Sequence, residues 1–171
     1  MTAPFGRRML RVAARRELGA YVVIVAPDPE GPAPEPGQFY MLAAGERWGG
    51  GEDERPHLPR ALSVLRAGAD GLEFLLDDVG PGTARLCELR PGDPLWVAGP
   101  FGRGFRVGGD ERAVLLCGGG VGAAPLALLQ DRLRQAGRAQ RALLGFRDGE
   151  HARGADLLHG ARVATDDGSA G

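Results

Sequence analysis

The sequence predicts two folds in succession: a small antiparallel Greek-key β-barrel over residues 1–107, then an incomplete parallel-sheet α/β domain over residues 108–171. Residues 7–107 hold short apolar or β-branched runs bounded by Gly, Pro or Asp, which is typical of strands joined by tight turns. After about Gly108, a continuous apolar run, a glycine cluster and a leucine-striped segment follow one another, as in a β-α-β unit. A doubly wound domain normally continues beyond a third strand, so we expect this second domain to be cut short at Gly171.

The first half is expected to contain strands, one helix and one long surface loop. The helix is expected over residues 83–89, because Leu86 and Leu89 share a face and the Pro91-Gly92-Asp93 turn ends it. The charged, glycine-rich stretch 45–59 is too polar for a core, which predicts a surface loop. The strands are expected at residues 10–15, 21–25, 38–42, 61–66, 72–76 and 94–98.

The second half is expected to alternate strands and helices. Residues 113–117 are uninterruptedly apolar, which predicts a strand buried on both faces. A leucine stripe over residues 125–136 predicts a helix that Gly137 ends. Further strands are expected at 141–146 and 161–165, with a helix at 150–159 between them. Right-handed crossovers would make this sheet parallel.

Composition excludes several classes of function. The net charge of −1 predicts no general attraction to nucleic acid or membranes. All 21 basic residues are arginine, so any anion must be bound by arginine or by backbone N–H groups. No apolar leader or membrane-length run is present, so we expect a cytoplasmic protein.

The cysteines and histidines predict no metal site. Cys87 and Cys117 stand beside apolar residues and are expected to be buried free thiols. His57, His151 and His159 are scattered and have no acidic or sulfur partner at ligand spacing.

A glycine-rich loop provides the strongest chemical signal. Gly118, Gly119, Gly120, Val121 and Gly122 lie between an expected buried strand and an expected helix. Glycines let the backbone approach a ligand closely, and a helix N-terminus offers free N–H groups to a dinucleotide pyrophosphate. The alternative is a plain strand-to-helix turn. The spacing is not G-x-G-x-x-G, which disfavours a standard dinucleotide-binding dehydrogenase.

An acidic turn follows the last expected strand, at Thr165, Asp166, Asp167, Gly168 and Ser169. Ligands in open α/β sheets lie at the carboxyl ends of the strands, where carboxylates can accept hydrogen bonds from ribose hydroxyls. The same carboxylates would repel a 2′-phosphate, which favours NADH over NADPH. The alternative is a helix N-cap or an acidic turn that only stabilises itself.

Two weaker signals lie in the first half. The segment Arg60-Ala61-Leu62-Ser63 opens a strand and offers a guanidinium and a hydroxyl to a phosphate or a flavin oxygen. The segment Gly80-Pro81-Gly82-Thr83 opens the expected helix and offers free N–H groups to a phosphate. For the second segment, simple capping by Thr83 is the alternative.

Taken in this order, the segments resemble the ferredoxin reductase-like flavoproteins and, more narrowly, the electron-transfer subunits of class 1B dihydroorotate dehydrogenase. The matching stretches span nearly the whole chain, and the combination is specific although each part is weak. They are residues 36–42, 60–63, 79–83, 89–93, 99–105, 118–126 and 164–171.

The resemblance implies an FAD barrel followed by an NAD(H) domain, with hydride passing from nicotinamide C4 to flavin N5. It implies that Arg60, Ala61, Leu62 and Ser63 contact the flavin, that Leu75, Leu76 and Asp77 run beside its adenine half, that Gly82 and Thr83 hold its pyrophosphate, and that residues 118–122 and 165–169 meet NAD(H). It names no catalytic side chain. It further implies a partner, the catalytic subunit that oxidises dihydroorotate to orotate in pyrimidine (UMP) biosynthesis.

The sequence departs from the family at three places. Ala61 replaces a usual proline, and Leu76-Asp77 replaces a frequent aromatic–basic pair. The family's 2Fe-2S cluster is held by four cysteines near the C-terminus, which Cys87 and Cys117 do not match. We therefore expect a truncated gene product or a fragment. The alternatives are a ferredoxin-NAD(P) reductase or sulfhydrogenase-type subunit, a non-catalytic flavin-binding module, and an unstable remnant.

Overall fold

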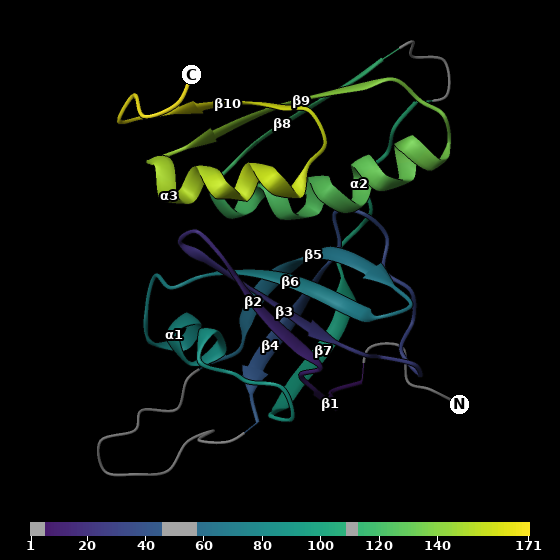
Figure 1. Ribbon diagram of the computed structural model, residues 1–171. Coiled ribbons are helices and arrows are strands. Elements are labelled where there is room, and N and C mark those ends of the chain that lie inside the picture. Colours follow the sequence, from purple (N-terminus) through teal and green to yellow (C-terminus); the bar gives the residue numbers. More distant parts are fainter. Residues whose placement is uncertain (1–5, 46–57, 109–112) are drawn as a thin grey trace.

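The computed structural model describes residues 6–45, 58–108 and 113–171, which form an antiparallel sheet and a parallel sheet with helices between them (Figure 1). The loop expected at 45–59 therefore lies almost wholly outside the described residues, as does His57. The antiparallel sheet has seven strands in the order β1-β7-β4-β5-β6-β3-β2. They are β1 (Arg8–Arg11), β2 (Ala14–Leu18), β3 (Tyr21–Ala26), β4 (Phe39–Ala44), β5 (Arg60–Gly68), β6 (Gly71–Asp77) and β7 (Pro94–Phe101).

The strand expected over residues 10–15 is in fact two strands, which corrects the prediction. The backbone N–H of Val12 donates to Asp93 O (3.0 Å), whereas the next N–H, of Ala13, donates to Val25 O (2.7 Å). The chain thus changes its pairing partner at this point, from β7 to β3. The small antiparallel β fold is confirmed, but over the described residues its ladder is not a closed barrel, because β1 and β2 stand at opposite ends of the strand order.

Helix α1 (Pro81–Cys87) connects β6 to β7 and begins two residues earlier than expected. Proline is well tolerated in the first turn of a helix, where its missing N–H has no partner to lose. Leu86 is 1% exposed and packs into the core formed by the inner face of the antiparallel sheet. Gly82 and Thr83, in the first turn of the helix, are also buried, whereas Pro81 is exposed.

The second unit is a three-stranded sheet that is parallel, as predicted, and its strands lie in the order β10-β9-β8. Gly137, with a φ of +66°, follows α2 as expected. The helix expected at 150–159 is split into an α and a 3-10 segment, and Gly154, a poor helix former, lies in the second. The elements are β8 (Val114–Gly119), η1 (Gly120–Ala123), α2 (Ala124–Gln135), β9 (Gln140–Phe146), α3 (Gly149–Ala152), η2 (Arg153–Leu157) and β10 (Ala161–Thr165).

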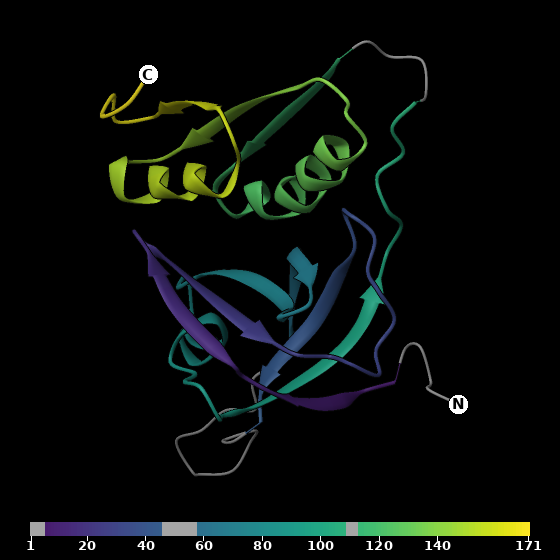
Figure 2. The same ribbon diagram turned by 45° about the vertical axis from the view of Figure 1, so that its right-hand side comes forward.

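The expectation that β8 is buried on both faces is wrong. Leu116 is 2% exposed, but its neighbour Leu115 is 58% exposed and Cys117 is also exposed. The cause is that α2, α3 and η2 all lie on the side of the sheet that faces the antiparallel sheet (Figure 2). The prediction of buried thiols is therefore wrong for Cys117, whereas Cys87 is half-buried.

The two units share a core. Strands β3, β5 and β6 are buried on both faces, so alternate side chains enter two different apolar clusters. Val22 and Ile24 of β3 pack in the apolar core of the antiparallel unit, whereas Tyr21 and Val23 pack with the helices of the second unit. Arg66 of β5 adds a polar tie, because it donates to Asp131 Oδ2 (2.9 Å) on α2 and to Leu157 O (2.7 Å) on η2.

The expected domain boundary at residues 107–108 lies in the connection between β7 and β8. No helix in the described part of the chain is long and apolar enough to span a membrane.

Candidate functional site

A hollow of about 500 Å³ lies between the two units and brings together three of the predicted segments. Asp77 ends β6 and Asp166 follows β10, whereas Gly119 ends β8 and the next two residues, Gly120 and Val121, begin η1. The carboxyl ends of the parallel strands meet at this edge of the sheet, as expected for a ligand site in an open α/β fold. The hollow is also lined by Tyr21, Gly145, Phe146, Arg147 and His151.

The glycine loop has the geometry of a strand-to-helix junction with room for a ligand. A Cβ at Gly118 would lie 2.7 Å from Leu126 Cδ1, so this glycine permits close packing of β8 against α2. Gly120 has a φ of +52°, a conformation that side chains with a Cβ rarely adopt. Gly122 has open space around it, and no acidic residue occupies the first turn of α2. The first N–H groups of the helical segment are therefore available to an anion.

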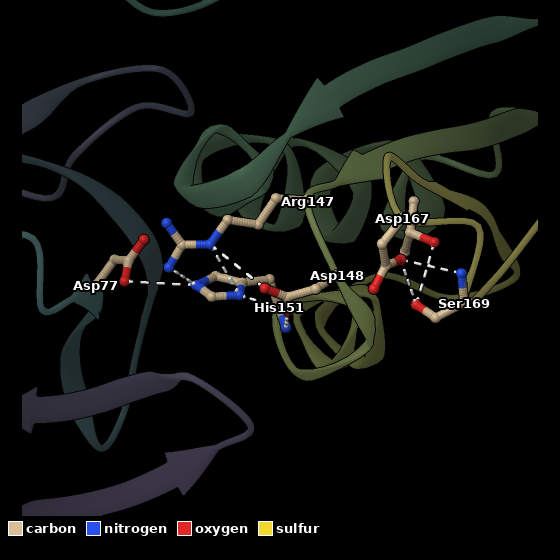
Figure 3. A network of polar contacts seen from close by, with 7 residues as sticks. Asp77, Arg147, Asp148, His151, Asp167 and Ser169 are labelled. Atoms are coloured by element: carbon tan, nitrogen blue, oxygen red, sulfur yellow. Dashed lines mark hydrogen bonds and ion pairs between the residues drawn. The ribbon is translucent and has the colours of Figure 1, made fainter.

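The acidic turn after β10 uses one of its two carboxylates internally. Asp167 Oδ1 accepts hydrogen bonds from the backbone N–H (2.9 Å) and the hydroxyl (2.7 Å) of Ser169 (Figure 3). These hydrogen bonds, the hydroxyl's first, lower the pKa of the Asp167 carboxyl. Thr165 Oγ1 likewise accepts from the N–H of Ala170 (2.9 Å). Of the segment 165–169, which also includes Gly168, Asp166 is the residue that lines the hollow.

In the antiparallel sheet, Arg60 lies against the start of α1. A Cβ at Gly82 would stand only 2.5 Å from Arg60 Nε, so the guanidinium fits there because residue 82 is glycine. Arg60 also donates from Nη1 to Leu58 O (2.9 Å). A cation beside a helix N-terminus is unfavourable unless an anion joins them, and the first turn of α1 contains no acidic residue.

Thr83 takes the capping role that was the alternative reading. Its Oγ1 accepts from the N–H of Val79 (3.1 Å) and of Gly80 (3.0 Å) and donates to Gly80 O (2.9 Å). The hydroxyl is therefore occupied. What Gly82 and Thr83 can offer a ligand is their backbone N–H groups, which have no acceptor in the preceding turn of a helix.

The remaining predicted residues are placed by the strands that carry them. On β5, Ala61 is exposed, Leu62 packs against the first core cluster, and Ser63 is half-buried opposite Phe39 of β4. On β6, Leu75 is 2% exposed and Leu76 is fully buried, and they enter opposite core clusters. Only Asp77, which follows them, has a side chain at the hollow.

Sequence reasoning missed the cluster around His151, which is 7% exposed (Figure 3). Its Nδ1 lies 2.7 Å from Asp148 Oδ1, and its Nε2 lies 3.8 Å from Asp77 Oδ1 of the other unit. The guanidinium of Arg147 lies against the same ring, with its Nε 3.2 Å from Nδ1. The Asp148-x-x-His151 spacing of a helix N-cap was the available signal.

Tyr21 completes this cluster from β3. Its ring meets the His151 ring edge-on, with centroids 5.3 Å apart and an interplanar angle of 87°. Its hydroxyl oxygen is buried and has no hydrogen-bond partner among the residues that the structure describes. Burial, and then the charge of Asp77, raises the pKa of Tyr21 to about 12. Among the described residues, no three or more His, Cys, Asp or Glu side chains are arranged to hold a metal ion.

Comparison with known proteins relates this geometry to a family. No family model matches the sequence. The chain is 40% identical over 144 residues to the "Probable dihydroorotate dehydrogenase B (NAD(+)), electron transfer subunit" of Methanopyrus kandleri, a match that covers 82% of this chain and 48% of the relative. It is 38% identical over 99 residues to the "Dihydroorotate dehydrogenase B (NAD(+)), electron transfer subunit" of Clostridium acetobutylicum, covering 58% of this chain and 37% of the relative. The chain is related to these electron transfer subunits. Where the match covers most of this chain, it covers only about half the length of the curated relative.

Solved structures establish the fold as ferredoxin reductase-like. Phthalate dioxygenase reductase superposes with a TM-score of 0.74 at 19% identity, covering 95% of this chain and 53% of that one. The structure of an NADH-dependent reduced ferredoxin-NADP oxidoreductase superposes with a TM-score of 0.74 at 25% identity, covering 97% and 59%. The antiparallel sheet followed by a parallel α/β unit is therefore the arrangement that these solved structures share with this chain.

Proposed function

We propose that this chain binds FAD and NAD(H) and passes electrons between NAD(H) and a partner catalytic subunit. The partner would be the subunit that converts dihydroorotate to orotate in pyrimidine (UMP) biosynthesis, in the cytoplasm. The observation that carries the proposal is the hollow between the units, where Gly119 to Val121 and Asp166 face Asp77. Asp77 ends the strand that leads into α1, so the proposed nicotinamide and flavin sites are neighbours along the same short connection.

The proposed flavin site consists of Arg60 and the start of α1. Arg60 and the N–H groups of Gly82 and Thr83 would bind the FAD pyrophosphate, which would satisfy the cation and the helix N-terminus together. Ala61, Leu62 and Ser63 would border the flavin through the strand backbone and the Ser63 hydroxyl. Leu75 and Leu76 are packed in the core, so we propose that they support the site and that Asp77 faces the ligand.

The proposed NAD(H) site consists of the glycine loop and Asp166. The N–H groups around Gly120, Val121 and Gly122 would hold the pyrophosphate, and Asp166 would accept a hydrogen bond from a ribose hydroxyl. Asp167 is occupied by Ser169, so the ribose contact rests on Asp166. The flavin, when bound, supplies the electron-accepting chemistry, and the residues of this chain bind and orient the two dinucleotides.

Reconstitution tests the proposal directly. The purified chain is titrated with FAD, excess flavin is removed, and NADH is added without oxygen while flavin absorbance is recorded. We expect a yellow protein that NADH bleaches. A protein that stays colourless contradicts the proposal, and a yellow protein that NADH does not bleach supports the alternative of a non-catalytic flavin-binding module.

A second candidate is a ferredoxin-NAD(P) reductase subunit or a sulfhydrogenase-type subunit. The 25% identity to the NADH-dependent reduced ferredoxin-NADP oxidoreductase favours considering it. The reconstituted chain is offered either the dihydroorotate-oxidising subunit or a ferredoxin as electron partner. Faster electron transfer to the ferredoxin would favour the second candidate.

A further inference from the structure

The cluster around His151 joins the two units and borders the hollow. Asp77 is the member of the cluster that the proposed function places toward a ligand, and His151 has no ligand contact in that proposal. Tyr21 comes from β3. Asp77 comes from β6, whereas Arg147 and Asp148 come from the link between β9 and α3 (Figure 3). His151 itself lies on α3, between the two carboxylates. It is one of three polar residues that are buried among the described residues, with Thr83 and Gln130.

The orientation of His151 is set from its own side of the interface. Asp148 Oδ1 accepts a hydrogen bond from the backbone N–H of His151 (2.9 Å) and lies 2.7 Å from its Nδ1. The Arg147 guanidinium contacts both ring nitrogens, with its Nε 3.2 Å from Nδ1 and its Nη2 against Nε2. Nε2 also lies 3.8 Å from Asp77 Oδ1, beyond hydrogen-bond distance, so the two groups form an ion pair only when the ring is protonated. Arg147 lies against the ring and Tyr21 meets it edge-on, so the ring has little freedom to rotate.

What His151 connects is the two proposed binding sites. Asp77 ends β6, and the chain continues through Asp78, Val79 and Gly80 into α1, where the flavin pyrophosphate would bind. Arg147 directly follows β9 and lines the hollow beside the glycine loop. A shift of α3 away from β6 would therefore change the distance between the two sites.

We propose that His151 is a positioning residue, which holds the end of β6 against the start of α3 and thereby fixes the flavin site relative to the nicotinamide site. The importance of this distance rests on the proposed function. Hydride transfer requires near contact of the two reacting rings, so a displacement of about 1 Å is sufficient to slow it substantially. A buried polar contact is no more stabilising than a well-packed apolar one, so its value here is the fixed orientation and not added stability.

Three substitutions of His151 separate the contacts of its ring with the two aspartates, Asp148 and Asp77. His151→Phe keeps the ring shape and removes both contacts. His151→Gln places an amide where Nε2 stands and can still reach Asp77, whereas His151→Asn places an amide where Nδ1 stands and can reach only Asp148. The exposed His159, changed to Phe, is the matched control on the same unit.

The first measurement is hydrogen–deuterium exchange of the chain without ligands, which does not depend on flavin binding. In His151→Phe and His151→Asn we expect exchange about tenfold faster both in α3 and at residues 76–80 of the other unit. In His151→Gln, residues 76–80 should exchange nearly as in the unchanged chain. If residues 76–80 are unaffected in all three variants, His151 only stabilises its own helix and the proposal is overturned.

The second measurement uses the chain reconstituted with FAD. In His151→Phe we expect FAD affinity within about twofold of the unchanged chain and flavin reduction at saturating NADH about tenfold slower, with His151→Gln restoring most of the rate. Equal reduction rates in all variants would also overturn the proposal. If the unchanged chain binds no flavin, the proposed function fails, and the exchange data still decide whether His151 joins the units. If His151→Phe does not fold, the Gln and Asn variants make the same comparison.

Discussion

Replacing Arg60 with alanine should weaken FAD binding by roughly ten- to a hundredfold, corresponding to about 1.5–3 kcal/mol for a hydrogen bond to a charged group. The structure gives the reason. The Arg60 guanidinium is packed over Gly82, where a Cβ would stand 2.5 Å from Nε, and no carboxylate is present in the first turn of α1 to neutralise it. A pyrophosphate bound there would contact both the guanidinium and the helix N–H groups, and the variant would lose the guanidinium.

The assay is a titration of the flavin-free chain with FAD, followed by the change in flavin fluorescence at constant ionic strength. Arg60→Lys keeps the charge but loses the planar fork, so we expect an intermediate affinity. Arg11→Ala is the matched control, because Arg11 is an exposed arginine that donates to Gly92 O on the same sheet. An Arg60→Ala dissociation constant within twofold of the unchanged chain would remove Arg60 from the site and refute the reasoning.

The remaining predictions concern stability, specificity, acid sensitivity and thiol reactivity. Arg66→Met should lower the free energy of unfolding in urea by about 1–2 kcal/mol, because it leaves Leu157 O and Asp131 without their partner. An equal loss in Arg16→Met, which removes a surface ion pair with Glu73, would argue against a special role of Arg66 in joining the two units. Asp166→Asn should raise the KM for NADH about fivefold, measured by steady-state reduction, and leave the FAD affinity unchanged, measured by FAD titration. An unchanged KM would exclude the proposed contact between Asp166 and the ribose. Two hydrogen bonds lower the pKa of Asp148, the larger effect coming from the backbone N–H of His151 and the smaller from its ring. Their contribution to stability is therefore full above the unfolded-state pKa of this carboxyl and is lost as the pH falls through its lower folded-state pKa. Urea unfolding across the acid range should therefore depend less on pH in Asp148→Asn, and an unchanged slope would contradict this. Burial raises the pKa of Cys87 to about 11, whereas Cys117 is exposed, so peptide mass spectrometry should find Cys117 alkylated first by iodoacetamide near pH 8.

Most of the secondary structure could be predicted from the sequence because its causes are local. A β-branched run predicted β3, short apolar runs between turn residues predicted β5 and β6, and a leucine stripe ending at Gly137 predicted α2. The division of residues 10–15 into β1 and β2 could not be predicted, because it depends on a change of partner between Asp93 and Val25. The exposure of Leu115 and Cys117 could not be predicted either, since an apolar run does not reveal which side of a sheet the helices cover.

The candidate site was predicted in part. Individual segments were found because glycines before a helix and acids after a strand carry local chemical signals. The sequence could not tell whether these side chains bind a ligand or stabilise their own segment. Hydrogen bonds in the structure show that the Thr83 hydroxyl caps α1 and that Asp167 binds Ser169 within its own turn. Tyr21 carries no such signal, because it looks like an ordinary strand residue, and the N-cap spacing of Asp148 and His151 does not reveal which residues of the other unit surround the ring.

By itself, the sequence determined the order of strands and helices and the placing of a glycine loop between β8 and α2, since both follow from neighbouring residues. Only the tertiary structure decided that Tyr21, Asp77, Gly120 and Asp166 line one hollow. These residues are far apart in the chain. Their meeting depends on strand register and on how the helices pack over β3, β5 and β6, which no periodicity in the sequence encodes.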